Sequence, residues 1–323
     1  MAWRLRLVPE KTNIDFFKAQ YVTFGASVVA MILTAVSLMV FGLNFGVDFK
    51  GGTTIRTEST QMVDVGEYRA AMDDLGLGDI TITEVFDPSF RDDQHVAMIR
   101  IEAQEGDEVV TPEVIAKVEA ALQGVDPSIT FPSVESVGPK VSSELIWSAL
   151  LAVVAGSVGI LIYVWVRFEW QFAVGTVAAL IHDVVVTVGV FSLLGLKFDL
   201  TIVAALLTIL GYSVNDTVVI FDRLRENLAK YKTMPLREMM NLTANETLSR
   251  TIMTASTTLI SLIVLFIFGG DVIRGFVFAM LFGVIVGTYS TLYVAKNIVL
   301  MIGLDRSDKP KSGGNHEFAN VDA

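Results

Sequence analysis

The sequence contains no cysteine, which excludes disulfide bonds and thiolate metal sites. It also has no metal-ligand spacing, nucleophile elbow or phosphate-binding glycine loop, so we expect neither covalent catalysis nor a bound metal or cofactor. A basic surface is missing too, because the formal net charge is −11. The segment 43–141 alone holds 19 of the 35 acidic residues and only 7 of the 24 basic ones. This charge balance argues against nucleic-acid binding.

Apolar length is what the sequence has in abundance. Hydrophobic residues make up 52% of the 323 positions, and the mean hydropathy is +0.57. Several apolar runs are long enough to cross a bilayer, which takes about 20 residues. The first run, 21–43, is too long for the apolar core of a signal peptide and is not followed by a small-residue cleavage site. We therefore expect a retained first transmembrane helix in an integral, multi-pass membrane protein.

Residues 44–141 have the pattern of one α+β domain inserted between the first and second membrane helices. It starts with the polar stretch NFGVDFKGGT, whose Gly51-Gly52 pair permits positive φ and a sharp change of direction. Alternating strand patterns and two short helical stretches follow in the order β-α-β-β-α-β. Thr111-Pro112 is a good cap and first-turn pair for the second of these helices. The order is that of ferredoxin-like domains, a fold that does not specify a function.

Five further apolar runs predict six membrane helices in all. The remaining spans are 142–166, 170–194, 199–221, 251–269 and 272–301, with 1–20, the connecting segment 222–249 and a disordered tail 302–323 outside them. Six spans place both termini on one side, and that side holds 15 of the 24 Lys and Arg residues. Of the other 9, 7 lie in the large domain, where long-loop charges count for little. We therefore expect both termini in the cytoplasm and the acidic domain outside.

The span 199–221 carries polar residues where lipid-like ones are expected. Asp216 lies about five residues, or roughly 7–8 Å, from the cytoplasmic end of this span, with Asn215 beside it. An acid deep in a bilayer helix costs about 2.5–3.5 kcal/mol on insertion scales, so it usually faces a protein interior and has a function. Asp216 is therefore the first candidate for a functional residue.

Arg250 stands at the cytoplasmic start of the next span, above a stripe of threonine and serine at helical spacing. Burial favours the neutral form of a carboxyl group, and a nearby guanidinium favours the charged form. A movement of Arg250 relative to Asp216 would therefore make the acid bind and release a proton. A simpler interpretation stays open, in which Asp216 hydrogen-bonds a neighbouring helix and Arg250 extends to lipid phosphate.

His182 and Asp183 form a second ionisable pair, in the third span. They are either a secondary polar site or part of the packing between helices. Aspartates in adjacent spans also occur in intramembrane aspartyl proteases, which need two carboxyls sharing a proton. The contexts here, IHD and VND, lack the glycine-flanked aspartate of that class, so we do not expect a protease.

Three segments carry a family resemblance: FGVDFKGGT after the first span, GLKFDLTIVAALLTILGYSVNDTVVIFDRLREN through the fourth, and LSRT at the start of the fifth. With the six-span layout, they closely resemble the SecD/SecF family of protein-export membrane proteins, related to the resistance-nodulation-division transporters. The resemblance implies a unit formed with SecD in the bacterial inner membrane. Such a unit works with the SecYEG channel and other Sec accessory subunits, and uses the proton motive force to draw unfolded polypeptide outward. The first segment holds the family motif residues Asp48, Gly51 and Gly52, to which no chemistry is assigned.

On this resemblance, the proton-linked aspartate falls on Asp216 and the basic residue of the same pathway on Arg250, with Asn215 adjacent. Protons would be the coupling ion, and no cofactor is implied. Two other functions remain open: a scaffold subunit whose polar membrane residues join helices, and half of a proton-coupled small-molecule exporter. Only proton coupling through the fourth span predicts a proton-dependent conformational change that Asp216→Asn removes.

Overall fold

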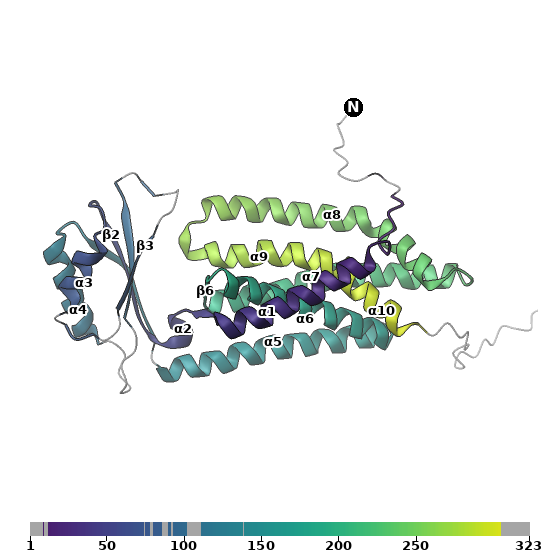
Figure 1. The fold of residues 1–323 in the computed structure, drawn as a ribbon, viewed down its shortest axis with the longest axis horizontal. Helices are drawn as coiled ribbons and strands as arrows, with labels where there is room; N and C mark the ends of the chain where they lie inside the picture. The colour runs from purple at the N-terminus through teal and green to yellow at the C-terminus, as the bar shows by residue number, and fades with distance from the viewer. Residues whose placement is uncertain are drawn as a thin grey trace, which may run out of the picture.

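Long helices lying side by side form most of the computed structural model, and a small α+β domain lies beyond one end of them (Figure 1). The structure describes residues 9, 12–73, 75–77, 80–85, 90–91, 93–101, 111–137 and 139–304. Within these residues, six helices are long and apolar enough to cross a membrane, which confirms the polytopic helical architecture. They are α1 (Gln20–Val40), α5 (Pro139–Arg167), α6 (Trp170–Leu193), α7 (Leu200–Lys230), α8 (Leu236–Phe268) and α9 (Asp271–Ser290), which continues through a π-helical turn (Thr291–Ala295) into α10 (Lys296–Ile302).

The connecting segment 222–249 is helical over most of its length, because α7 and α8 extend well beyond their apolar parts. Polar contacts between the two extensions account for this. Arg223 Nε and Asn227 Nδ2 both donate to Glu246 Oε2, each at 2.8 Å. The predicted tail 302–323 lies outside the described residues beyond position 304.

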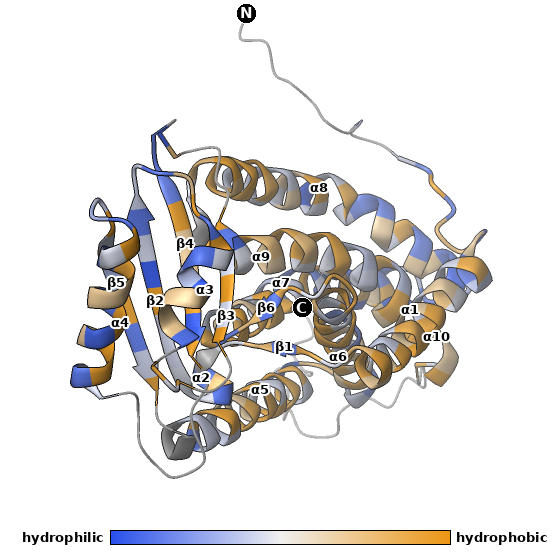
Figure 2. Ribbon diagram, turned by 60° about the vertical axis from the view of Figure 1, so that its left-hand side comes forward, coloured by the Kyte–Doolittle hydropathy of each residue, from blue (hydrophilic) through white to orange (hydrophobic). Residues whose placement is uncertain are grey.

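Helices α6, α7 and α9 form the buried centre of the bundle. In the most apolar stretch of α6 and of α7, half of the residues are buried. The corresponding share is none in α5 and 11% in α8. Glycines bring the central helices close to their neighbours. A Cβ atom at Gly283 of α9 would collide with Ile209 of α7, and one at Gly189 of α6 with Thr34 of α1. Figure 2 shows the contrast between the hydrophobic bundle and the more hydrophilic domain.

The domain contains one antiparallel sheet with strand order β3-β4-β2-β5. Its elements follow one another as β2 (Gly52–Ser59), α3 (Val65–Asp73), β3 (Ile80–Val85), β4 (His95–Ile101), α4 (Pro112–Val125) and β5 (Thr130–Val137). An apolar core that includes Ile55, Ile99 and Leu122 lies between the sheet and the two helices. Thr111 caps α4 as predicted, since its side chain accepts a hydrogen bond from the Val114 amide.

Asp126, directly after α4, is a buried acid of the domain with only 3% of its surface exposed. Its carboxylate accepts hydrogen bonds from the Ser128 amide at 2.8 Å, the Ser128 hydroxyl at 2.7 Å and the Ser59 hydroxyl. Burial alone would raise the pKa of Asp126, but these hydrogen bonds outweigh it and hold the pKa below its ordinary value.

Three short elements at the domain end of the bundle were not predicted from the sequence. These are β1 (Asn44–Phe45), α2 (Val47–Lys50) and β6 (Lys197–Phe198). Strands β1 and β6 pair in parallel, so the polar stretch after α1 lies against the loop before α7. Two-residue strands leave almost no periodic signal in a sequence, which is why the pairing was missed.

At the far end of the bundle, the chain before α1 docks onto α8. Asn245 bonds both backbone groups of Ile14, at 2.8 Å each. Phe16 and Phe17 are buried there, with their ring centroids 4.7 and 4.3 Å from the Nζ atom of Lys296. Lys296 is 1% exposed, and its Nζ has no hydrogen-bond partner in the described part of the chain.

Candidate functional site

Asp216 lies on α7 and is 3% exposed. Two groups of α8 interact with its carboxylate, the hydroxyl of Thr254 and the guanidinium of Arg250. No direct ion pair joins Asp216 to Arg250 in the described chain, and Arg250 itself is exposed. One carboxylate oxygen, Oδ2, is buried without a hydrogen-bond partner among the described residues. Asp216 is therefore a buried acid whose polar contacts are incomplete.

The α7 surface next to Asp216 is polar or small, although it is exposed at membrane depth. Asn215 is exposed rather than directed toward the bundle centre, and Tyr212 is half-buried. The exposed positions recur every three or four residues, so they form one stripe: Thr201, Ala204, Thr208, Gly211 and Asn215.

Helix α8 adds a second polar stripe beside it. Thr257 and Ser261 are exposed, and their hydroxyls donate to carbonyls of their own helix. Thr257 donates to Met253 and Thr254 at 3.0 Å each, and Ser261 donates to Thr257 at 3.1 Å. Arg250 stands at one end of this stripe. We name the α7 and α8 stripes together the polar face. Small and hydroxyl-bearing side chains are common where membrane helices meet, so the polar face is suited to contact another helix bundle.

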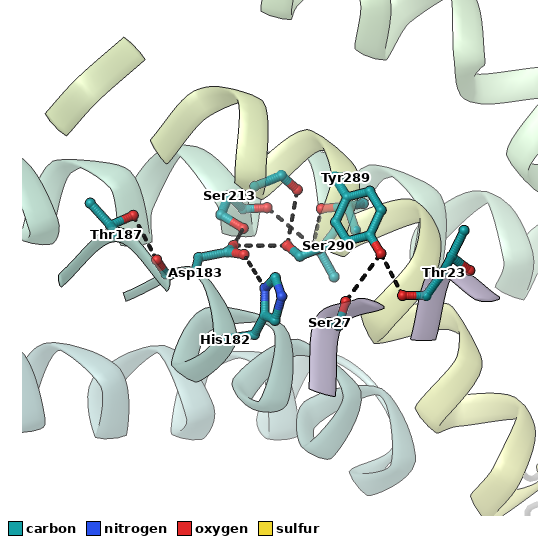
Figure 3. Close-up of polar contacts among 11 residues, drawn as sticks. Thr23, Ser27, His182, Asp183, Thr187, Ser213, Tyr289 and Ser290 are labelled. Carbon is teal, nitrogen blue, oxygen red and sulfur yellow. Dashed lines mark hydrogen bonds and ion pairs between the residues drawn. The ribbon is translucent and has the colours of Figure 1, made fainter. Parts of the chain in front are cut away.

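The second acid, Asp183 on α6, has a different environment. It is 0% exposed, and its Oδ2 accepts hydrogen bonds from Ser213 of α7 at 2.7 Å and Ser290 of α9 at 2.8 Å. Its Oδ1 lies 3.0 Å from Nδ1 of His182. Figure 3 shows the three side chains converging on the carboxylate. Asp183 therefore joins the three central helices, as a buried acid with both oxygens hydrogen-bonded.

A separate set of hydrogen bonds beside this cluster joins α9 to α1. The Tyr289 hydroxyl donates to the Thr23 carbonyl at 2.6 Å and accepts from the Ser27 hydroxyl at 3.2 Å, as Figure 3 also shows. Nothing in the sequence around Ser290 or Tyr289 predicts these contacts. Only Ser213 left a signal, because it precedes Asp216 by one helical turn in the GYSVNDT block.

The two acids lie on neighbouring helices and differ in their partners. Both oxygens of Asp183 are hydrogen-bonded, whereas Oδ2 of Asp216 has no hydrogen-bond partner among the described residues, and Arg250 near it is exposed. Of the two, Asp216 is the better suited to change its protonation state. No cluster of three metal-ligating side chains occurs in the part of the chain that was described.

The residues of the glycine-pair motif lie at the domain end of the bundle. Asp48 Oδ2 accepts a hydrogen bond from the Leu200 amide, at 3.0 Å, and so caps α7. Gly51 and Gly52 have φ angles of 73° and 113°, a region that strongly favours glycine. The motif is about 16 residues along α7 from Asp216, or roughly 24 Å at 1.5 Å per residue.

Comparisons with known proteins agree with this arrangement. Residues 117–305 match the family model "Protein export membrane protein SecD/SecF, C-terminal", and residues 36–61 match the SecD/SecF GG motif. The chain is 69% identical to the protein translocase subunit SecF of Cereibacter sphaeroides, over all of both chains. It is 64% identical to SecF of Rhodobacter capsulatus, over 99% of this chain and 98% of that protein.

Two solved structures are also similar. The crystal structure of SecDF from Thermus thermophilus, described as a translocon-associated membrane protein, is 33% identical with a TM-score of 0.81 over 92% of this chain. A SecDF structure in a super-membrane-facing form is 35% identical with a TM-score of 0.66 over 93% of this chain. This chain spans only 39–40% of those two SecDF chains. With its helix bundle, its glycine-pair motif and its full-length relatives, the chain belongs to the SecD/SecF family of protein-export membrane proteins.

Proposed function

We propose that this chain pairs with a SecD-type subunit to form an accessory unit of the Sec translocase, which uses the proton motive force to promote export of unfolded polypeptides. The observation that carries the proposal is the Asp216 carboxylate, which is buried on a central helix and has one oxygen without a hydrogen-bond partner among the residues that the structure describes. The proton is the coupling ion, and the chain performs no covalent catalysis and needs no cofactor.

The arrangement of Asp216 and Arg250 supports a simple coupling step. In the described conformation Arg250 acts on the carboxylate without a direct ion pair. A closer approach of the guanidinium favours the charged carboxylate, and its withdrawal favours the neutral acid. A movement of α8 against α7 therefore changes proton binding at Asp216. The membrane potential supplies about 2.3 kcal/mol per charge per 100 mV to such a cycle.

The polar face supports the choice of partner. The SecDF chains that resemble this one are more than twice as long, so a second part of those proteins lies outside the similarity. We propose that a SecD helix bundle covers the polar face and closes the surroundings of Asp216 against lipid. The SecYEG channel and the exported chain are the further partners.

The proposed setting is the bacterial inner membrane, with both termini in the cytoplasm and the acidic domain on the outside. This orientation rests on the distribution of Lys and Arg among the loops. We further propose that the domain is ferredoxin-like, because the strand order β3-β4-β2-β5 with antiparallel neighbours is the arrangement of that fold.

The test is gradient-driven export in vesicles that contain the assembled complex. Asp216→Asn should abolish the gradient-dependent part of export while the complex still assembles, and Arg250→Met should impair it. The matched control is Asp222→Asn, which makes the same change on the same helix at a half-exposed surface ion pair with Arg167. That variant should export like the native protein.

A scaffold function is the second candidate, and the Asp183 cluster favours it because that cluster joins three helices. A scaffold predicts that Asp216→Asn still exports in response to the gradient once the complex has assembled. That result would remove proton coupling from the proposal.

A further inference from the structure

The first turn of α7 is capped by two acids of different origin. The first four amides of a helix lack intrahelical partners and favour a negative group. Asp199 is the local cap, accepting from the amides of Thr201 at 3.0 Å and Ile202 at 3.3 Å. Asp48 is a second cap that comes from 152 residues earlier in the chain, and it accepts from Leu200 at 3.0 Å. The helix that carries Asp216 is thus tied at its start to the segment that leads into the domain.

Backbone pairing fixes this segment against the loop before α7. Phe45 lies opposite Phe198 in the β1–β6 pair, and the Gly46 amide donates to the Phe198 carbonyl at 2.8 Å. A Cβ atom at Gly46 would lie 3.0 Å from the Lys197 side chain and 3.1 Å from Cβ of Asp199. Gly46 therefore permits a close approach, because a Cβ atom there would be tighter than an ordinary contact and its neighbours would have to shift.

The same segment is attached to the domain. Gly51 and Gly52 both have positive φ, and Gly52 is already the first residue of β2, which is hydrogen-bonded to strands on both sides. On β4, Arg100 Nη1 donates to the carbonyl of Phe45 at 3.0 Å. A movement of the sheet would therefore also move the β1–β6 pair, through Arg100, and the first turn of α7, through Asp48.

We propose that residues 44–52 are a mechanical joint, in which Asp48 is the positioning residue that transmits movement of the domain to α7. A helix transmits a shift of its first turn along its axis, and the joint is about 24 Å from Asp216. The hydrogen bond, not the negative charge, is what the joint requires. The inference rests on the proposed function only for its export readout.

The direct test measures the position of the domain relative to the bundle in the full chain. Because the chain has no cysteine, Ala120→Cys on α4 and Leu193→Cys at the end of α6 give two unique labelling sites, both exposed. Electron-spin distance measurements in lipid nanodiscs should give one narrow distribution for the native joint. Asp48→Ala should broaden it at least twofold. Asp48→Asn retains an acceptor oxygen and should leave it narrow.

Asp199→Ala is the matched control, because it removes a cap of the same helix that is not attached to the domain. A joint predicts that this variant keeps the narrow distribution, whereas simple fraying of α7 predicts the same broadening as Asp48→Ala. Gly46→Ala leaves both acids in place and should also broaden the distribution, so it tests the joint should Asp48→Ala fail to fold. The proposal is overturned if the distance distribution stays narrow in both Asp48→Ala and Gly46→Ala. It is also overturned if Asp48→Asn broadens the distribution as much as Asp48→Ala does.

The second arm compares gradient-driven export by the assembled complex. Asp48→Ala should lose at least tenfold of the gradient-dependent rate, and Asp48→Asn and Asp199→Ala should keep most of it. If the native complex exports without any response to the gradient, the proposed function fails, yet the distance measurements still decide whether the joint exists. If Asp48→Ala broadens the distance but exports normally, the joint does not serve transmission and the proposal is wrong.

Discussion

Replacing the buried acid of α6 by leucine should destabilise the bundle by a predictable amount. Asp183→Leu removes the acceptor of the Ser213 and Ser290 hydroxyls and the partner of His182. Ser290 retains a second acceptor, the Gly287 carbonyl at 3.1 Å. The hydroxyl of Ser213 and the imidazole of His182 therefore account for most of the lost hydrogen bonding. A buried polar group left unpaired costs about 1–3 kcal/mol, whereas hydrogen bonds between membrane helices average about 0.6 kcal/mol. We expect a loss of about 2 kcal/mol.

The assay is thermal unfolding of the purified full chain in detergent. A change of 2 kcal/mol corresponds to a fall in Tm of about 4–8 °C for a chain of roughly this size. Asp183→Asn keeps one acceptor oxygen for both serine hydroxyls and should lose less than half as much. The combination of Asp183→Leu with Ser213→Ala removes the stranded hydroxyl and should recover part of the loss, a coupling that a double-mutant cycle measures.

A Tm within about 1 °C of the native value for Asp183→Leu would refute this reasoning, because a saturated acid between three helices would then contribute nothing to their packing. Additive effects of the leucine and alanine substitutions would refute it in another way. They would mean that the acid and the serine do not stabilise each other.

Three further predictions concern other parts of the chain. Gly189→Ala should cost about 1–3 kcal/mol in the same unfolding assay, since the added methyl collides with Thr34, and Thr34→Ala should partly restore stability. Lys296→Met should raise Tm by about 2–4 °C, because it removes a buried amino group that has no hydrogen-bond partner among the described residues, and the methionine still fills the space beside the two phenylalanine rings. A lower Tm would show that the contacts between Nζ and the rings dominate. Asp126→Asn should destabilise the domain at neutral pH but not in acid. The pKa of Asp126 is lower in the folded state than in the unfolded state. The stability that the charged carboxylate contributes is therefore fully present above the unfolded-state pKa of about 3.9, and it is lost as the pH falls through the folded-state pKa. Denaturant unfolding followed at pH 7 and pH 3 measures the difference, and an equal loss at both values would contradict the assignment.

The large features of this fold are readable from the sequence because they rest on long, repeated signals. Apolar runs of about 20 residues predict the membrane helices, and glycine, proline and threonine mark the turns and caps of the domain. The ends of α7 and α8 were not predicted, because outside the apolar spans a helix held by polar contacts such as Arg223–Glu246 has the composition of a loop. The periodicity of a sequence does not predict contacts between residues that are far apart along the chain.

The candidate site divides in the same way. An acid in an apolar run identifies Asp216 and Asp183 without any structure, since each is out of place by composition. Their different roles could not be predicted, because they depend on which helix faces each acid. The Ser213 and Ser290 hydroxyls both donate to Asp183, and no group of the described residues donates to Oδ2 of Asp216. Likewise, nothing local in the sequence pairs Asp48 with an amide 152 positions away.

The docking of Ile14 onto Asn245 also restricts the order of assembly during synthesis. The chain emerges from its N-terminus, so the segment before α1 waits while more than two hundred further residues are made. Its other partner, Lys296, follows later still. The earliest part of the protein to be translated therefore completes its contacts among the last, and a nascent chain stalled before α8 has to hold Phe16 and Phe17 without their final environment.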